Sequence, residues 1–148
     1  EAQCIPLESL ETLRLLSNLE TEKQKLVQVI MFGQPELDEK LANPSVRQLR
    51  QRIVLHYRMP GLRREEVAHY LRHRLRVAGY RGNDLFTGNT AALLWHLSYG
   101  TPRLVNILAH KSLLLAFGEG KSFVTKNHVV QAGRDTEGAR KISWWRTL

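Results

Sequence analysis

The chain has 148 residues, 43% of them hydrophobic, which is enough to bury the core of one domain or slightly more. Its net charge of +8 favours polyanions, acidic proteins or anionic lipid surfaces as partners. Cys4 is the only cysteine, so an internal disulfide is excluded, and no apolar run reaches the length of a membrane span. We expect a soluble, cytoplasmic protein, and the start at Glu1 without a methionine suggests a piece of a longer one.

The first 60 residues predict helices that alternate with two strands. Leucines spaced by three indicate an amphipathic helix that begins at Leu7 and ends near Asn18. Two apolar runs are typical of strands, at residues 25–33 and 53–59. Two short segments between them are typical of helices, at residues 35–42 and 44–52. This order predicts the end of an α/β layer within a first domain, residues 1–60.

After Pro60 and Gly61 the composition becomes strongly basic and helical. Val67, Leu71 and Leu75 form an apolar stripe at helical spacing. Four helices are expected, the first ending at Gly79 and the last opened by Thr125 as N-cap: 63–79, 90–99, 102–117 and 126–133. The sequence therefore predicts a small all-helical domain, residues 61–148.

The stretch "GTPRLVN", Gly100–Asn106, places a cation in the first turn of a helix. Pro102 suits the first helical position and Thr101 is a candidate cap. The first turn carries the positive end of the helix dipole, so Arg103 is mildly unfavourable there unless an anion lies nearby. Two interpretations are open at this point: a phosphate contact, or an ordinary surface arginine.

Four segments together resemble one family: "EAQ" at the start, "LRLLSNLETEKQKLVQVIMFGQPEL", "LRQRI" at Leu49–Ile53, and "GTPRLVN". They are similar to the second half of the AAA+ ATPases of the ExeA/GspA/MshM type, which act in secretion and pilus biogenesis, and the chain looks closest to the MshM type. The resemblance implies the C-terminal part of an AAA+ α/β core with an incomplete parallel sheet, followed by a helical lid domain. The P-loop half would precede this chain.

The resemblance also implies roles for two residues of the first domain in the hydrolysis of ATP. Glu1 matches the Walker B glutamate, whose carboxylate orients or deprotonates the attacking water. The alternative is a frayed chain end. Gln34 matches the sensor-1 position, which contacts the γ-phosphate or the water. The alternative is that Gly33, Gln34 and Pro35 only form a turn after a strand.

Two arginines complete the implied site. Arg52 matches the arginine finger, which reaches the γ-phosphate of a neighbouring subunit, although Arg47 and Arg50 compete for this role. Arg103 matches sensor 2, which is carried by the lid and points at the β- and γ-phosphates. The catalytic residues implied are thus Glu1 and Arg52, and those that bind the cofactor are Gln34 and Arg103.

The resemblance implies ATP and Mg²⁺ as cofactors of the intact parent, with neither bound tightly by this chain. Without the P-loop, the chain alone is expected to be inactive. The implied partners are further copies in an AAA+ oligomer and components of a pilus or secretion apparatus at the inner membrane. The implied location is the cytoplasm, with attachment to the periphery of the inner membrane as a variant.

Other functions compete with this interpretation. The arginines between Arg63 and Arg81 are compatible with a DNA-binding regulator or a transposition ATPase, although they surround the helix and favour a solvated face or an acidic protein partner. A third alternative is an interaction module without catalysis.

His69 and His73 have a spacing that zinc accepts but lack a third ligand, so no metal site is expected. The adjacent Trp144 and Trp145 predict at least one exposed indole near the C-terminus.

Overall fold

The computed structural model describes residues 1–19 and 26–141, and the chain divides into two compact units, which we call unit 1 (Glu1–Arg58) and unit 2 (Met59–Leu148). Trp144 and Trp145 lie outside the described residues. Among the described residues no helix has both the length and the hydropathy that crossing a bilayer requires.

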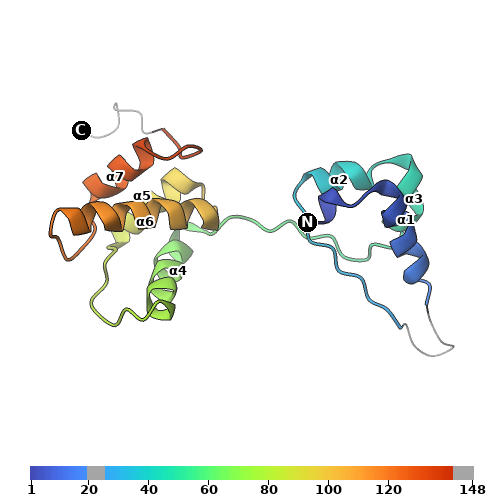
Figure 1. Ribbon diagram of the computed structural model, residues 1–148, viewed down its shortest axis with the longest axis horizontal. Coiled ribbons are helices and arrows are strands. Elements are labelled where there is room, and N and C mark those ends of the chain that lie inside the picture. Colours follow the sequence, from blue (N-terminus) through green and yellow to red (C-terminus); the bar gives the residue numbers. More distant parts are fainter. Residues whose placement is uncertain (20–25, 142–148) are drawn as a thin grey trace. The chain divides into compact units, whose positions relative to one another are not determined.

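Unit 1 is built from short helices around a small core (Figure 1). Its elements are the 3-10 helices η1 (Ala2–Cys4) and η2 (Pro44–Val46) and the α-helices α1 (Leu7–Leu16), α2 (Glu36–Leu41) and α3 (Arg47–Arg50). The expected helices are confirmed, but only part of the leucine face of α1 is covered: Leu10 is fully buried, whereas Leu16 is exposed. The fully or nearly buried residues are Ala2, Leu10, Leu37, Leu41, Val46 and Leu49.

The predicted strands are absent from the described part of unit 1, so the expected α/β core with its incomplete parallel sheet is wrong. Residues 26–33 and 53–59 form no strand, and most of their apolar side chains face solvent, with Ile30 75%, Phe32 71% and Val54 91% exposed. Met31 and Ile53 are partly buried against the core. A strand exists only when its N–H and C=O groups pair with a neighbour. Segment 26–33 makes two such bonds to other described residues, from Ala2 N–H to the Phe32 carbonyl at 2.8 Å and from Leu26 N–H to the Leu19 carbonyl at 3.0 Å. No strand lies beside either segment within the described ranges.

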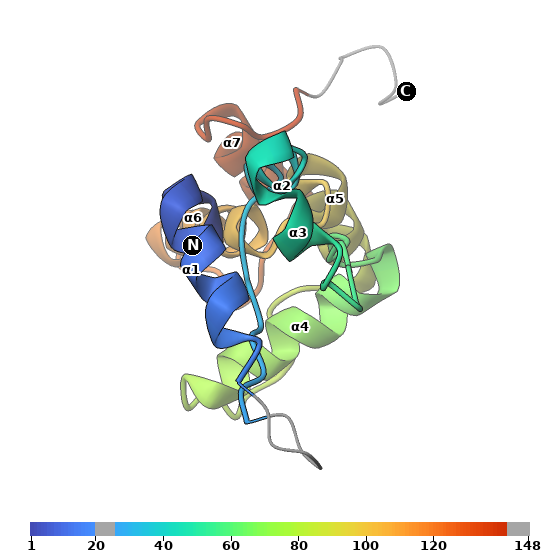
Figure 2. The ribbon, with the colours of Figure 1, turned by 90° about the vertical axis from the view of Figure 1, so that its right-hand side faces the viewer.

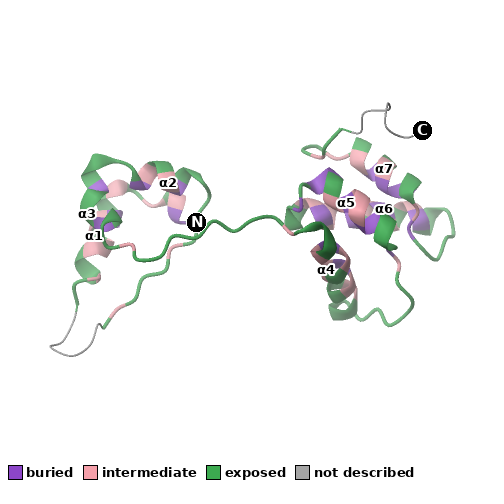
Figure 3. Cartoon of the chain, turned by 180° about the vertical axis from the view of Figure 1, so that it is seen from behind, coloured by how far each residue is buried: buried purple, intermediate pink, exposed green. Residues whose placement is uncertain are grey.

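Up to residue 141, unit 2 contains four helices: α4 (Arg64–Val77), α5 (Gly88–Ser98), α6 (Pro102–Gly118) and α7 (Lys126–Arg134). Helix α6 packs against α5 and α7, and α4 packs mainly against α5 (Figure 1). Figure 2 shows α4 along its length while α6 points toward the viewer, so these two helices cross. Buried residues gather on the sides where α5, α6 and α7 meet (Figure 3). The predicted helices of this unit are therefore confirmed.

Local chemistry explains where these helices begin and end. Thr125 accepts a hydrogen bond from the His128 N–H and caps α7, as predicted. Pro102 occupies the first position of α6 and Thr101 the N-cap position before it, as predicted, but the Thr101 side chain makes no capping hydrogen bond. Helix α4 ends with Gly79 at φ +91°, where a residue without Cβ is favoured.

Candidate functional site

Two of the candidate residues, Glu1 and Gln34, belong to stretches of unit 1 that hydrogen bonds hold together. Ala2 N–H donates to the Phe32 carbonyl, and the Gln34 N–H donates to Gln3 Oε1 at 3.2 Å. These two bonds hold the first residues of the chain against the end of segment 26–33, with Gln3 bonded to Gln34. Both side chains are exposed, and neither makes a hydrogen bond or ion pair with another described residue.

Gly33 and Lys40 stabilise this junction. A Cβ on Gly33 would lie 2.8 Å from Leu37 Cδ2 and 3.3 Å from Gln3 Oε1, so a larger residue would make the Leu37 side chain shift. Lys40 Nζ donates to the carbonyls of Gln3 and Ile5 at 2.6 and 2.7 Å. Because its ammonium is used in this way, Lys40 holds the N-terminal segment rather than offering a free cation.

Arg52 lies in the turn after α3, at the other end of α1 from Glu1. Its Nη1 is 3.5 Å from Ser17 Oγ, a weak contact with the residue that caps the C-terminus of α1. Ten helical residues separate the two ends of α1, which corresponds to about 15 Å. Arg47 and Arg50 are exposed as well, and among the described residues none of the three has a carboxylate partner. The geometry therefore leaves the choice between them open.

Arg103 is the second residue of α6, and the turn before it is tightly built. Tyr99 and Gly100 both have positive φ, +53° and +71°, which reverses the chain after α5. Gly100 lies against Leu62: its carbonyl accepts the Leu62 N–H at 2.8 Å, and a Cβ on it would lie 2.1 Å from the Leu62 carbonyl oxygen. Trp95 Nε1–H donates to that same carbonyl at 3.0 Å.

The Arg103 guanidinium is exposed and makes no hydrogen bond or ion pair with the rest of the described chain. The first N–H groups of α6 have no side-chain cap either. A helix N-terminus with unpaired N–H groups and an adjacent arginine is suited to an anion. Glu1, Gln34 and Arg52 belong to unit 1, whereas Arg103 belongs to unit 2.

One ionic cluster of unit 1 was not anticipated from the sequence. Asp38 Oδ1 lies 2.9 Å from His56 Nε2, and Arg58 donates to Asp38 Oδ2 through Nε and Nη2 at 3.2 and 2.8 Å. The Arg58 guanidinium, and to a smaller extent His56, lowers the pKa of Asp38 below its ordinary value. These contacts attach segment 53–59 to α2. The partners are 18 and 20 residues apart, so no local pattern reveals the pairing.

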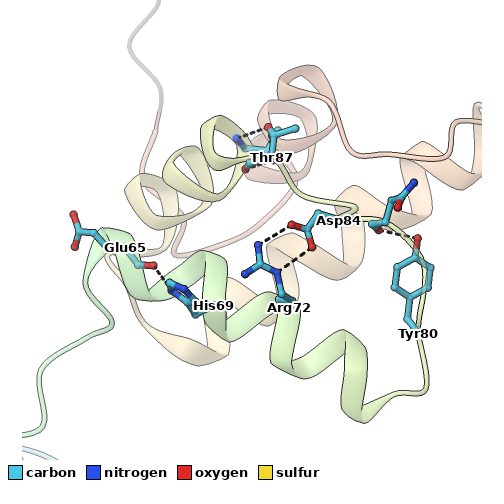
Figure 4. A network of polar contacts seen from close by, with 8 residues as sticks. Glu65, His69, Arg72, Tyr80, Asp84 and Thr87 are labelled. Atoms are coloured by element: carbon cyan, nitrogen blue, oxygen red, sulfur yellow. Dashed lines mark hydrogen bonds and ion pairs between the residues drawn. The ribbon is translucent and has the colours of Figure 1, made fainter.

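The basic helix α4 makes specific polar contacts (Figure 4). Arg72 forms a two-point ion pair with Asp84, at 3.0 Å from Nε and 2.7 Å from Nη2, which lowers the pKa of that carboxyl. His69 Nδ1 lies 3.2 Å from the Glu65 carbonyl. Within residues 1–19 and 26–141, no three His, Cys, Asp or Glu side chains are grouped as a metal would require.

Comparison with known proteins gives two matches. Residues 1–41 match a family described as "AAA domain". General secretion pathway protein A of Aeromonas hydrophila is 40% identical over 147 residues, which are 99% of this chain and 27% of the relative. The chain thus spans little more than a quarter of that relative's length. No solved structure matches significantly.

Proposed function

We propose that this chain, whose matches support the AAA+ ExeA/GspA family, is part of a longer ATPase that works in secretion. The observation that carries the proposal is the 40% identity, which extends over 99% of the chain and so through both units. We further propose that ATP hydrolysis by the whole protein supports the assembly of a pilus, of the MSHA type, or of a type II secretion-like apparatus.

In this proposal, Glu1 and Gln34 act together at the phosphates. The Ala2–Phe32 and Gln3–Gln34 hydrogen bonds attach the first residues of the chain to the segment that ends at Gln34, and the Glu1 and Gln34 side chains are uncommitted within the described chain. A carboxylate beside an amide fits Mg²⁺-ATP and its attacking water, with Glu1 accepting the proton of the water and Gln34 donating to a phosphate oxygen. ATP supplies the phosphoanhydride bond. The 148 residues contain no GxxxxGK[ST] loop to hold the phosphates, so a further segment is required for binding.

Arg103 and Arg52 supply positive charge from two different places. Arg103 stands at the uncapped N-terminus of α6 and is free to contact the β- and γ-phosphates. Arg52 lies about 15 Å of helix away from the Glu1 end of α1, which supports a role on a neighbouring copy rather than on the phosphates near Glu1. We therefore propose self-association, and a cytoplasmic location at the inner membrane beside the machinery that the ATPase assembles.

The experiment that tests this function compares Glu1→Gln with Glu8→Gln in the full-length encoded protein. Both changes remove one exposed carboxylate, and Glu8 lies in the first turn of α1, where we assign no catalytic role. Glu1→Gln should abolish phosphate release while ATP still binds, and Glu8→Gln should behave as wild type. Equal hydrolysis by both variants, or hydrolysis by the 148-residue chain alone, would contradict the proposal.

The charge distribution favours a second candidate, a DNA-binding AAA+ regulator or transposition ATPase. Residues 59–148 hold 14 Lys and Arg against 6 Asp and Glu, whereas residues 1–58 hold 8 of each. A gel-shift series with duplex DNA at increasing salt separates the candidates. Tight binding with a steep salt dependence favours the regulator, because each phosphate contact releases counterions.

A further inference from the structure

Two cavities of unit 2 share one wall, the side chain of Tyr80. The first, of about 300 Å³, lies between the C-terminal half of α4 and the loop that follows it, and Arg72, Arg76 and Arg81 line it. The second, of about 420 Å³, lies between this loop and the end of α6 and is mainly apolar. We call the two cavities together the Tyr80 face. Its apolar lining includes Leu85, Leu113, Ala116, Phe117, Phe123 and Val124.

The shared wall is held in place by the sequence of the loop. After the left-handed Gly79, the Tyr80 N–H donates to the Leu75 carbonyl at 2.9 Å, which closes the end of α4. The Tyr80 hydroxyl donates to the Asn83 carbonyl at 2.9 Å (Figure 4). A Cβ on Gly82 would lie 2.5 Å from that hydroxyl, so a larger residue would push the Tyr80 ring from this position. These contacts hold the Tyr80 ring between the two cavities.

The first cavity carries an excess of positive charge. Arg72 is neutralised by its two-point pair with Asp84 (Figure 4). Arg76 and Arg81 are exposed and have no hydrogen-bond or ion-pair partner among the residues described, although Arg76 is close enough to Asp84 to help lower the pKa of that carboxyl. Three arginines against one carboxylate leave an excess of positive charge, and guanidinium groups are suited to carboxylates because each presents a planar pair of donors.

The second cavity is flanked by aromatic side chains that the fold itself does not bury. Phe117, at the end of α6, is 84% exposed, and Phe123, in the loop before α7, is 52% exposed. Exposed aromatic residues beside a concave apolar surface are typical of protein-binding sites. Lys121, at the edge of this cavity, is already paired with Glu119 at 2.6 Å.

We propose that the Tyr80 face binds a short segment of a partner protein in which acidic residues are followed by an apolar one. The carboxylates pair with Arg76 and Arg81, and the apolar side chain enters the second cavity beside Phe117. A nucleic-acid backbone offers charge for the first cavity alone and leaves the apolar cavity unused, so the combination favours a peptide. This site does not include Glu1, Gln34, Arg52 or Arg103, so peptide binding here can be tested separately from ATP hydrolysis.

The test titrates the ¹⁵N-labelled 148-residue chain with the synthetic peptide acetyl-Asp-Asp-Glu-Leu-Phe and follows amide shifts by NMR. We expect shifts around both cavities. The double variant Arg76→Glu with Arg81→Glu should weaken binding about tenfold or more, since charge-assisted bonds are lost. The matched control is Arg64→Glu with Arg74→Glu, which makes the same charge change on α4 outside the cavities and should leave the affinity within about twofold.

Two further probes separate the two cavities and the two kinds of partner. Phe117→Ser should lower the affinity for the peptide without unfolding the chain, because the Phe117 side chain is largely exposed. A second peptide ends in Ser-Ser instead of Leu-Phe. Its affinity for the wild-type chain should be as low as the affinity of the Leu-Phe peptide for Phe117→Ser. The proposal is overturned if no peptide binds at millimolar concentration, if both double variants weaken binding equally, or if duplex DNA binds the same residues more tightly than the peptide does.

Discussion

The imidazole of His128 is 1% exposed, and its Nε2 lies 3.0 Å from the carboxylate oxygen Oε2 of Glu119. On the other side of the ring, Nδ1 accepts the Thr125 N–H at 3.2 Å. Because Nδ1 is an acceptor, Nε2–H donates a hydrogen bond to Glu119 Oε2. His128 thus links the N-terminus of α7 to the segment after α6.

Glu119 should make the stability of unit 2 depend on pH in the acid range. Lys121 first, and then His128, lowers the pKa of Glu119 from 4.5 to about 2. A lowered carboxyl pKa gives a contribution that is complete above 4.5 and is lost as the pH falls toward about 2. Urea midpoints measured between pH 7 and pH 2 should show this loss in wild type and less of it in Glu119→Gln. The control is Glu137→Gln, whose profile should match that of wild type. Identical profiles for wild type and Glu119→Gln would refute the prediction.

Gly100→Ala should destabilise unit 2 more than Gly79→Ala does. Both glycines have positive φ, where a Cβ costs about 1–2 kcal/mol. At Gly100 the added Cβ would also lie 2.1 Å from the Leu62 carbonyl oxygen, whereas at Gly79 it meets nothing within 4 Å. Thermal unfolding followed by circular dichroism gives the comparison. Equal losses of stability would mean that the Leu62 contact relaxes without cost.

Arg103→Ala in the full-length encoded protein should weaken ATP binding more than ADP binding, since only ATP presents the γ-phosphate. A charge-assisted contact of about 1.5–3 kcal/mol corresponds to a loss of roughly tenfold to a hundredfold. Arg103→Lys should recover part of it, because a single ammonium does not reproduce the paired donors. Nucleotide titrations of these variants, with Arg64→Ala as control, make the measurement. Equal weakening of ATP binding and ADP binding would mean that Arg103 is an ordinary surface arginine.

Arg52→Ala should abolish ATP turnover in the full-length encoded protein and leave nucleotide affinity nearly unchanged, because a finger acts on the transition state in a neighbouring copy. Mixing these subunits with Glu1→Gln subunits, which keep the finger, should restore phosphate release. Arg47→Ala and Arg50→Ala, tested in the same way, show which arginine of the α3 region has this role. No rescue in any mixture would contradict a finger that acts between subunits.

Helices were predictable from the sequence because their determinants are local. The apolar stripe of α4, Pro102 at the start of α6 and the Thr125 cap of α7 each act within a turn or two of the chain. The candidate residues Glu1, Gln34, Arg52 and Arg103 came from motif resemblance, and their roles remain predictions. The structure adds that the Gln34 N–H is hydrogen-bonded to Gln3, two residues after Glu1.

What the tertiary structure alone decided depends on contacts between distant residues. The segments 26–33 and 53–59 have the composition of strands, but a strand requires a partner for its backbone, and composition does not supply one. In the same way, Asp38 meets Arg58, Leu62 meets Gly100, and Tyr80 joins two cavities only because the folded chain brings them together. Sequence patterns determine turns and helices through neighbours along the chain, whereas pairing, burial and cavities depend on which surfaces the whole fold places in contact.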